Sequence, residues 1–307
     1  MIRLFRIRMN RMDLAIPVWF WVVGGIFSLL TVLGNGLVMY LIISRKRLHS
    51  TINWFLFSLA AADFSVGFLC FSFLAGRYDP SNKCVAEAIR WLFLDLSMTN
   101  LCALTIDRYM AIATPLKYTA FKAKGRHLSL ISAAWIIPLA FHFVPFTVVC
   151  YLNSHIVLKI CHAIWLFVYK LPSCLLLITA CSRTLYITHR QNKRQRILLS
   201  QLLFNGFAFD DMKNSGSQGR ATTFSKAFGI IVAIFFICYA IDIARLFCFT
   251  FHCISDIPTD LVHTQRLLFI CNSAFNPFIY SNMKQDIRKE VKLFFQIRSA
   301  TRELNLG

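Results

Sequence analysis

The chain has 307 residues, of which 57% are hydrophobic and only 15% are charged, and its formal net charge is +19. A soluble domain has about a quarter of its residues charged, so this composition excludes an ordinary soluble protein and indicates a membrane protein. The positive charge does not indicate nucleic-acid binding, because the basic residues gather in short connections between long apolar runs.

Seven apolar runs follow one another along the chain, and each is long enough to cross the hydrocarbon of a bilayer. Because lipid offers the backbone no hydrogen-bond partners, and because the runs are continuous rather than alternating, we expect each to be a helix. The sequence therefore predicts an all-α membrane protein, a seven-helix transmembrane bundle. The spans are expected at 17–43, 53–74, 85–112, 128–149, 156–186, 223–251 and 262–280.

The loop charges predict the orientation of the bundle. Most loop lysines and arginines lie in one set of connections, whereas the opposite loops contribute Arg77 and Lys83. The basic side faces the cytoplasm. Residues 1–16 are therefore expected outside, the seven-helix bundle at 17–280 in the membrane, and 281–307 inside. The arginines before residue 12 oppose translocation of this N-terminus, and translation from Met12 would remove the conflict; the choice between Met1 and Met12 stays open.

A final helix is expected at about 283–295. Its apolar residues alternate with lysines and arginines at helical spacing, as at Ile287, Arg288, Val291 and Lys292. Such a basic amphipathic helix suits the anionic inner face of a membrane. The alternative is a disordered tail.

Two short motifs indicate signalling rather than catalysis. Asp107-Arg108-Tyr109 ends the third span, and Asn276-Pro277-Phe278-Ile279-Tyr280 ends the seventh. A carboxylate beside an arginine can hold a switch closed. A proline within a polar helical segment allows that helix to bend.

The ordered set of motifs over about 17–295 resembles the rhodopsin-like (class A) G-protein-coupled receptors. The resemblance rests on Gly34-Asn35, Leu59-Ala60-Ala61-Ala62-Asp63, Asp107-Arg108-Tyr109 with Pro115-Leu116, Trp135, Pro172, Phe235-x-x-Cys238 and Asn276-Pro277-x-x-Tyr280. It implies a multi-pass plasma-membrane receptor that binds an extracellular ligand and couples to a heterotrimeric G protein. It also implies arrestin as a possible partner, although the short tail offers few phosphorylation sites.

The resemblance implies a sodium site at the buried carboxylate of the second span. The matching residues are Asp63, Ser97, Asn272, Ser273 and Asn276, with Asn35 nearby. Oxygen ligands around one carboxylate suit a hard cation. The alternative is a water-filled polar network that holds the helices together, and no other cofactor is expected.

The resemblance also assigns a switch and a coupling surface. Arg108 would be released from Asp107 on activation, Tyr109 completes that motif, and Pro115 and Leu116 would contact the G protein. Tyr239 would be the aromatic switch in the sixth span. Asn276, Pro277 and Tyr280 would be the switch residues of the seventh span. Pro172, Met98 and Phe235 would form a trio between ligand and switch, or would simply pack in the core.

Several positions depart from the family pattern. The sixth span reads Cys238-Tyr239-Ala240-Ile241 without the usual proline, and Ala180 replaces the usual tyrosine of the fifth span. Ala221 stands where many inactive receptors have an acid, which predicts appreciable basal activity. Cys84 and Cys150 resemble the family disulfide, with Cys84 displaced by one residue.

The ligand-binding candidates are Arg90, Leu94, Lys170, Asp242 and Arg245. Arg90 occupies the position where amine receptors have an aspartate, which argues against a biogenic amine. An arginine binds carboxylates and phosphates in a bidentate manner, so an acidic or zwitterionic small molecule, or a peptide, is expected. The alternative is that Arg90 and Asp242 pair with each other.

Other functions are less well supported. A transporter is expected to show internal repeats, which this sequence lacks. A membrane enzyme would need grouped catalytic side chains, whereas His142, His155 and His162 are scattered and have no clear acid partner. A receptor-like protein that does not signal, and acts as a partner or decoy, remains the main alternative.

Overall fold

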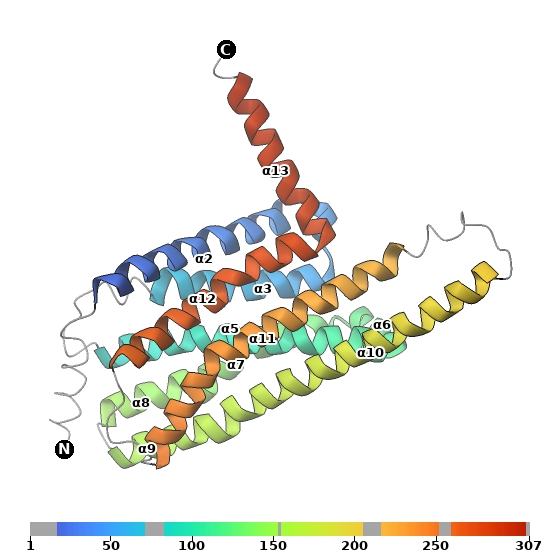
Figure 1. Cartoon of the computed structure of the whole chain (residues 1–307). Coiled ribbons are helices and arrows are strands. Elements are labelled where there is room, and N and C mark those ends of the chain that lie inside the picture. Colours follow the sequence, from blue (N-terminus) through green and yellow to red (C-terminus); the bar gives the residue numbers. More distant parts are fainter. Residues whose placement is uncertain (1–16, 71–82, 153–154, 205–215, 252–258, 305–307) are drawn as a thin grey trace.

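A computed structural model describes residues 17–70, 83–152, 155–204, 216–251 and 259–304. Within these residues the chain is helical and has no strand, which confirms the predicted class (Figure 1). The elements are α2 (Val18–Ser44), η1 (Lys46–Leu48), α3 (Thr51–Ser65), η2 (Val66–Cys70), α5 (Lys83–Ala113), α6 (Pro115–Ala123), α7 (Arg126–Pro138), η3 (Leu139–Phe143), α8 (Val144–Leu152), α9 (His155–Ile164), η4 (Trp165–Lys170), α10 (Leu171–Phe204), α11 (Gly216–Phe251), α12 (Thr259–Met283) and α13 (Gln285–Leu304).

Three of the predicted spans contain a π-helical turn. The turn η2 follows α3 at the end of the described part of the second span, whereas η3 joins α7 to α8 in the fourth span and η4 joins α9 to α10 in the fifth. Six of the described spans are long and apolar enough to cross a membrane by length and composition. The seventh, α12, falls short of that apolarity because it carries polar residues such as Gln265, Asn272 and Asn276.

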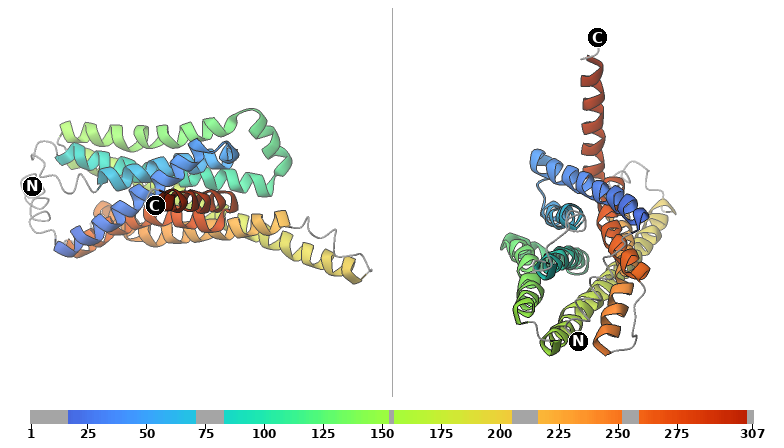
Figure 2. Two further views of the ribbon diagram at one scale, coloured as in Figure 1. Left: turned by 90° about the horizontal axis from the view of Figure 1, so that it is seen from above. Right: turned by 90° about the vertical axis from the view of Figure 1, so that its left-hand side faces the viewer.

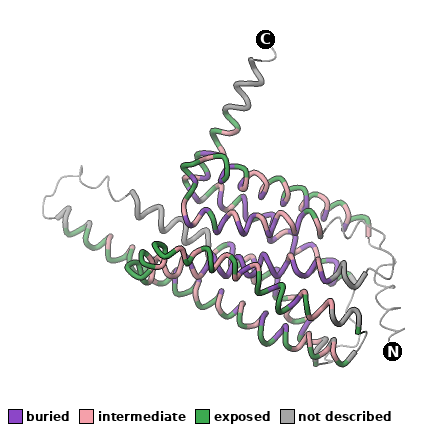
Figure 3. The backbone as a smooth tube through the Cα atoms, turned by 180° about the vertical axis from the view of Figure 1, so that it is seen from behind, coloured by how far each residue is buried: buried purple, intermediate pink, exposed green. Residues whose placement is uncertain are grey.

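The spans form a closed ring around α5. Helix α2 packs against α3 and α12, α11 packs against α10 and α12, and α5 contacts α3, α7 and α10 (Figure 2). Burial shows that α5 is central. In its most apolar stretch 83% of the residues are buried, against 17% for the span that contains α7. Figure 3 shows the same contrast between the buried centre and the exposed outer helices.

Two close contacts explain why small and polar residues occur inside these apolar helices. A Cβ atom added to Gly67 of η2 would lie 2.8 Å from the Thr31 side chain of α2, so only glycine allows this approach. Trp135 of α7 donates a 2.9 Å hydrogen bond from its indole to Ser58, which donates in turn to Asn100 at 2.5 Å. These two hydrogen bonds connect α7, α3 and α5.

The helices of the fifth and sixth spans are longer than the sequence predicted. The connection at about 187–222 was expected to be a loop, yet α10 continues to Phe204 and α11 begins at Gly216. Figure 1 shows α10 extending beyond the rest of the bundle. The prediction was wrong because it used apolarity to place helix ends, whereas arginine, lysine and glutamine are good helix formers in water.

The final helix is confirmed and is also longer than expected, since α13 runs to Leu304. It leaves the bundle at a steep angle (Figures 1 and 2). Ile287 is buried at its start, whereas Leu293 and Phe295 are 42% and 56% exposed. Within the described residues the structure therefore supports an amphipathic helix rather than a disordered tail. The predicted segment 1–16 lies outside the described residues.

Candidate functional site

A buried carboxylate joins three helices in the middle of the bundle. Asp63 of α3 is fully buried, and its Oδ1 accepts hydrogen bonds from the hydroxyls of Ser97 at 2.6 Å and Ser273 at 2.8 Å. Its Oδ2 accepts a 2.7 Å hydrogen bond from the amide of Asn276. Four of the five residues expected around a sodium ion are therefore brought together by α3, α5 and α12.

The fifth predicted residue, Asn272, is also buried, but none of the hydrogen bonds of Asp63 among the described residues comes from it. Its Oδ1 and the Oδ1 of Asn35 have no hydrogen-bond partner among the described residues. Unsatisfied buried acceptors are uncommon and indicate a missing donor or cation. An oxygen-rich set with one carboxylate and free acceptors fits a hard cation such as sodium.

The polar cluster continues to α2 through a feature created by proline. Pro277 has no backbone N–H, so the carbonyl of Ser273, four residues earlier, has no intrahelical donor. The side-chain amide of Asn35 donates a 3.2 Å hydrogen bond to that carbonyl. A Cβ atom on Gly34 would lie 3.0 Å from the Pro277 ring, so the two helices meet closely here.

A second polar site lies at the other end of α5. Arg108 pairs with Asp107, with its Nε 2.9 Å from Oδ2. The hydroxyl of Tyr118 in α6 donates a 3.0 Å hydrogen bond to Asp107 Oδ1 and accepts one of 3.3 Å from Arg108. The predicted closed pair is therefore present, and Tyr118 completes it. Sequence reasoning missed Tyr118, because nothing in its spacing showed that the connecting segment would form a helix.

The predicted coupling residues surround this site. Pro115 occupies the first turn of α6, and Leu116 beside it is 87% exposed. Tyr109 is partly exposed. An exposed leucine on the helix that holds Tyr118 is suited to contact a partner protein. The side chain of Ala221 lies outside the described residues.

The predicted switch residue Tyr239 is buried beside Leu94 of α5, on the side of the Asp63 cluster away from Arg108. Its ring stacks on Phe235 with centroids 4.0 Å apart, and its hydroxyl donates a 3.2 Å hydrogen bond to the Leu94 carbonyl. Met98 and Phe235 lie in the core. Pro172 is exposed, so the predicted core trio with these two residues is wrong. The π turn η4 directly precedes Pro172 and changes which residues face inward.

Tyr280 at the end of the seventh-span motif is also buried. Its hydroxyl has no hydrogen-bond partner among the described residues. The side chains of Cys84 and Cys150 lie outside the described residues, so their disulfide stays a prediction.

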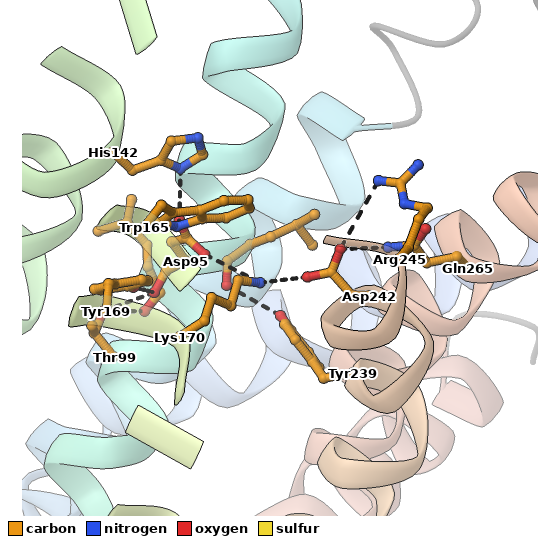
Figure 4. Close-up of polar contacts among 12 residues, drawn as sticks. Asp95, Thr99, His142, Trp165, Tyr169, Lys170, Tyr239, Asp242, Arg245 and Gln265 are labelled. Atoms are coloured by element: carbon orange, nitrogen blue, oxygen red, sulfur yellow. Dashed lines mark hydrogen bonds and ion pairs between the residues drawn. The ribbon is translucent and has the colours of Figure 1, made fainter. Parts of the chain in front are cut away.

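The ligand-binding candidates lie at the end of the bundle opposite Arg108. Lys170 donates to Asp242 at 2.7 Å, and Arg245 lies 4.0 Å from the same carboxylate (Figure 4). The guanidinium carbons of Arg90 and Arg245 lie 4.7 and 5.8 Å from the centre of the Trp91 ring. Four of the five candidates thus form one charged cluster, with Leu94 buried beneath it as the acceptor for Tyr239. Asp242 pairs with Lys170 and Arg245.

Sequence reasoning missed a second carboxylate in this cluster. Asp95 of α5 is fully buried, with Oδ2 2.6 Å from Nδ1 of His142 and 3.0 Å from the Trp165 indole nitrogen. Its Oδ1 lies 3.6 Å from the Lys170 ammonium. A carboxylate within an apolar span was the same signal that identified Asp63, and it could have identified Asp95.

The comparisons with known proteins agree with this geometry. A family profile described as "7 transmembrane receptor (rhodopsin family)" matches residues 34–280. The chain belongs to the rhodopsin family of seven-transmembrane receptors. It is therefore a multi-pass membrane receptor of a family that signals through G proteins, and its relatives are receptors rather than enzymes.

Individual relatives are distant. The chain is 27% identical to adenosine receptor A2a of Homo sapiens over 85% of its own length and 68% of that protein. It is 32% identical to 5-hydroxytryptamine receptor 2C of Homo sapiens over 54% of its own length and 40% of that protein. The region matched to the rhodopsin family includes the Asp63 cluster, the Asp107–Arg108 pair and the charged cluster around Asp95 and Lys170.

Proposed function

We propose that this rhodopsin-family chain is a plasma-membrane receptor that binds an acidic or zwitterionic ligand and activates a heterotrimeric G protein. Its N-terminus lies outside the cell and its C-terminus inside. The ligand, a small molecule or a peptide, binds beside Trp91 in the outer half of the bundle. Coupling takes place at the opposite end, around Arg108.

One observation carries the proposed ligand class. Arg90, Lys170 and Arg245 all lie in the outer cluster, and the guanidinium groups of Arg90 and Arg245 lie over one indole ring, that of Trp91. A guanidinium group binds a carboxylate or phosphate in a bidentate manner. Because the relatives are named for adenosine and for 5-hydroxytryptamine, and differ from each other, neither ligand is proposed for this chain.

The inner half of the bundle supports the proposed coupling. Arg108 is held by Asp107 and Tyr118, and these bonds must break before the arginine can contact another protein. A sodium ion held by Asp63, Ser97, Ser273, Asn276 and Asn272 would neutralise the buried carboxylate and stabilise this closed state. Receptors coupled in this way are also bound by arrestin, which we expect to engage this short tail weakly.

G-protein dissociation in cells tests the coupling. Wild type and Arg108→Ala are compared at matched surface expression across all G-protein classes. We expect a basal signal in the wild type, since Ala221 provides no carboxylate for a second restraint, and its loss in the variant. A wild type that is silent both alone and with every ligand tried would favour the non-signalling alternative, for which the unbroken α11 and Ala180 are the structural arguments.

The ligand class is tested in the same assay with acidic, zwitterionic and basic compound sets. Arg90→Met should lower the potency of an active acidic compound by about tenfold or more, because it removes one charge-assisted contact. Arg47→Met, which removes an exposed cation at the other end of the bundle, is the matched control. Activation by basic compounds alone would contradict the proposed class.

A further inference from the structure

The ammonium group of Lys170 is surrounded by the kinds of side chain, carboxylates and aromatic rings, that form binding sites for organic cations. The whole side chain is buried, with 0% of its surface exposed. Its Nζ lies 2.7 Å from Asp242 Oδ2 and 3.6 Å from Asp95 Oδ1. A buried lysine needs one carboxylate for charge balance, whereas this one has two, on different helices.

Aromatic rings enclose the same ammonium. Nζ lies 4.8 Å from the ring centres of both Trp165 and Tyr239, and 5.8 Å from that of Trp91. Three rings around one ammonium are the arrangement by which proteins bind organic cations, because the face of each ring is negative. Carboxylates and rings together come from the third, fifth and sixth spans (Figure 4).

The walls of this site are held in place by bonds that do not involve Lys170. Asp95 Oδ2 accepts from His142 and from the Trp165 indole. Asp242 Oδ1 accepts a 2.6 Å hydrogen bond from the amide of Gln265. Because these contacts would persist if the lysine were shortened, the site is preorganised for its occupant.

One atom of the site remains unsatisfied. Asp95 Oδ1 is buried and has no hydrogen-bond partner among the described residues, since Lys170 lies too far away at 3.6 Å. A buried carboxylate oxygen without a donor is uncommon. The ammonium therefore forms a hydrogen bond with Asp242 but only a longer ion pair with Asp95. A ligand that is covalently attached to the helix would behave in this way, because its side chain limits how far it can reach.

We propose that Asp95, Asp242, Trp91, Trp165 and Tyr239 form a binding site for a primary alkylammonium ion, and that Lys170 is its built-in occupant. The receptor thus supplies this cation from its own chain. The acidic ligand of the proposed function would bind next to an already filled cation site. Since Tyr239 stacks on Phe235, the occupant contacts the switch directly.

Chemical complementation tests the site. Lys170→Ala removes three carbons and the nitrogen, which together correspond to n-propylammonium. The thermal midpoint of the purified variant in nanodiscs is measured with n-propylammonium, with neutral 1-propanol and with neither. We expect n-propylammonium to raise the midpoint of the variant by several degrees and to leave the wild type unchanged. Half-saturation is expected at about 0.1–10 mM, since the ligand has only a few heavy atoms.

A double variant separates the site from a general effect of amines. Lys170→Ala with Asp242→Asn keeps the space but removes one carboxylate, so the response to n-propylammonium should disappear. If Lys170→Ala reaches the surface poorly, n-propylammonium is added during expression and surface level becomes the measured quantity. An equal response in the single and double variants, or equal action of 1-propanol, would overturn the proposal.

Lys170→Met provides a test that does not depend on a cavity. Methionine fills similar space without charge and leaves the two carboxylates without their cation, so its thermal midpoint should lie clearly below that of the wild type. An unchanged midpoint would show that the ammonium is dispensable and would refute the proposal. Ligand binding by Lys170→Ala without any signalling would support this site while contradicting the proposed receptor activity, so the two failures can be told apart.

Discussion

Tyr118 in α6 donates a hydrogen bond of 3.0 Å to Asp107, the same residue that holds Arg108. Burial raises the pKa of the Tyr118 hydroxyl above its usual value near 10, so the group keeps its proton at physiological pH. The short helix α6 therefore restrains Arg108 in its pair with Asp107, and the strength of this restraint can be measured.

Tyr118→Phe should increase basal G-protein activation, because it removes two hydrogen bonds to the closed Asp107–Arg108 pair and keeps the ring. Each hydrogen bond contributes about 1 kcal/mol, so an increase of about fivefold for one bond and up to about thirtyfold for both is expected at matched surface expression. Tyr186→Phe, which removes a hydroxyl from a 65% exposed residue of α10, is the control. A basal signal equal to that of the wild type would show that Tyr118 does not restrain the arginine.

Asn35→Ala should destabilise the receptor by about 1–3 kcal/mol, because the Ser273 carbonyl freed by Pro277 would lose its donor inside the bundle. The free energy of unfolding or the thermal midpoint in detergent is the measurement. Ser65→Ala is the matched control, since Ser65 donates only to Ala61 of its own helix. An equal loss of stability in the two variants would mean that the hydrogen bond between Asn35 of α2 and Ser273 of α12 contributes no more than a bond within one helix.

Sodium chloride should raise the thermal midpoint of the wild type relative to N-methylglucamine chloride at the same ionic strength. At ten times its Kd a ligand stabilises the folded state by about 1.4 kcal/mol. Asp63→Asn should abolish this difference, because the carboxylate that attracts the cation is lost. Potassium chloride is the ion control. A sodium effect that persists in Asp63→Asn would place the ion elsewhere.

Lys284 joins α12 to α13, where its ammonium contacts Asn53 and lies 3.1 Å from Asp286. Burial lowers the pKa of Lys284 to about 8. The unfolded chain, with a lysine pKa near 10.4, binds the proton more tightly between these values, so the free energy of unfolding should rise as the pH increases from about 8 to about 10. Below pH 8 the full cost of the buried charge is present.

The thermal midpoints of wild type and Lys284→Met, measured from pH 7 to pH 10, test this dependence. The wild type should gain stability relative to the variant across the upper part of that range, by on the order of 3 kcal/mol. Lys289→Met, which removes an exposed lysine of the same helix, should show no such relative change. A constant difference between wild type and Lys284→Met would contradict the lowered pKa.

The central polar cluster was largely predictable. A carboxylate inside an apolar span is costly, which singled out Asp63, whereas Ser97, Ser273 and Asn276 followed from the resemblance to the receptor family. These four residues meet at one carboxylate. The Asp107–Arg108 pair followed from its motif. Motif spacing sufficed there, since neighbouring residues on a helix stay together whatever the tertiary structure does.

The outer cluster was only partly predictable. Lys170, Asp242 and Arg245 were named, but Asp95 was passed over although it stands in an apolar span like Asp63. The partner of Asp242 depends on how the fifth and sixth spans are rotated, which no residue pattern fixes. The π turn η4 buries Trp165, Leu166, Tyr169 and Lys170, and nothing in the sequence marked the position of that turn.

That π turn has a consequence for how this chain is compared with its relatives. A π turn holds one residue more than an α turn, and one residue of an α-helix corresponds to a rotation of about 100°. An alignment that runs through the fifth span without a gap therefore pairs residues before Trp165 with the wrong counterparts in any relative whose fifth span is a regular α-helix. Deletion of a single residue within Trp165–Lys170 that restored a regular α-helix would turn α9 by about 100° about the span axis relative to α10, a change that no single substitution could make.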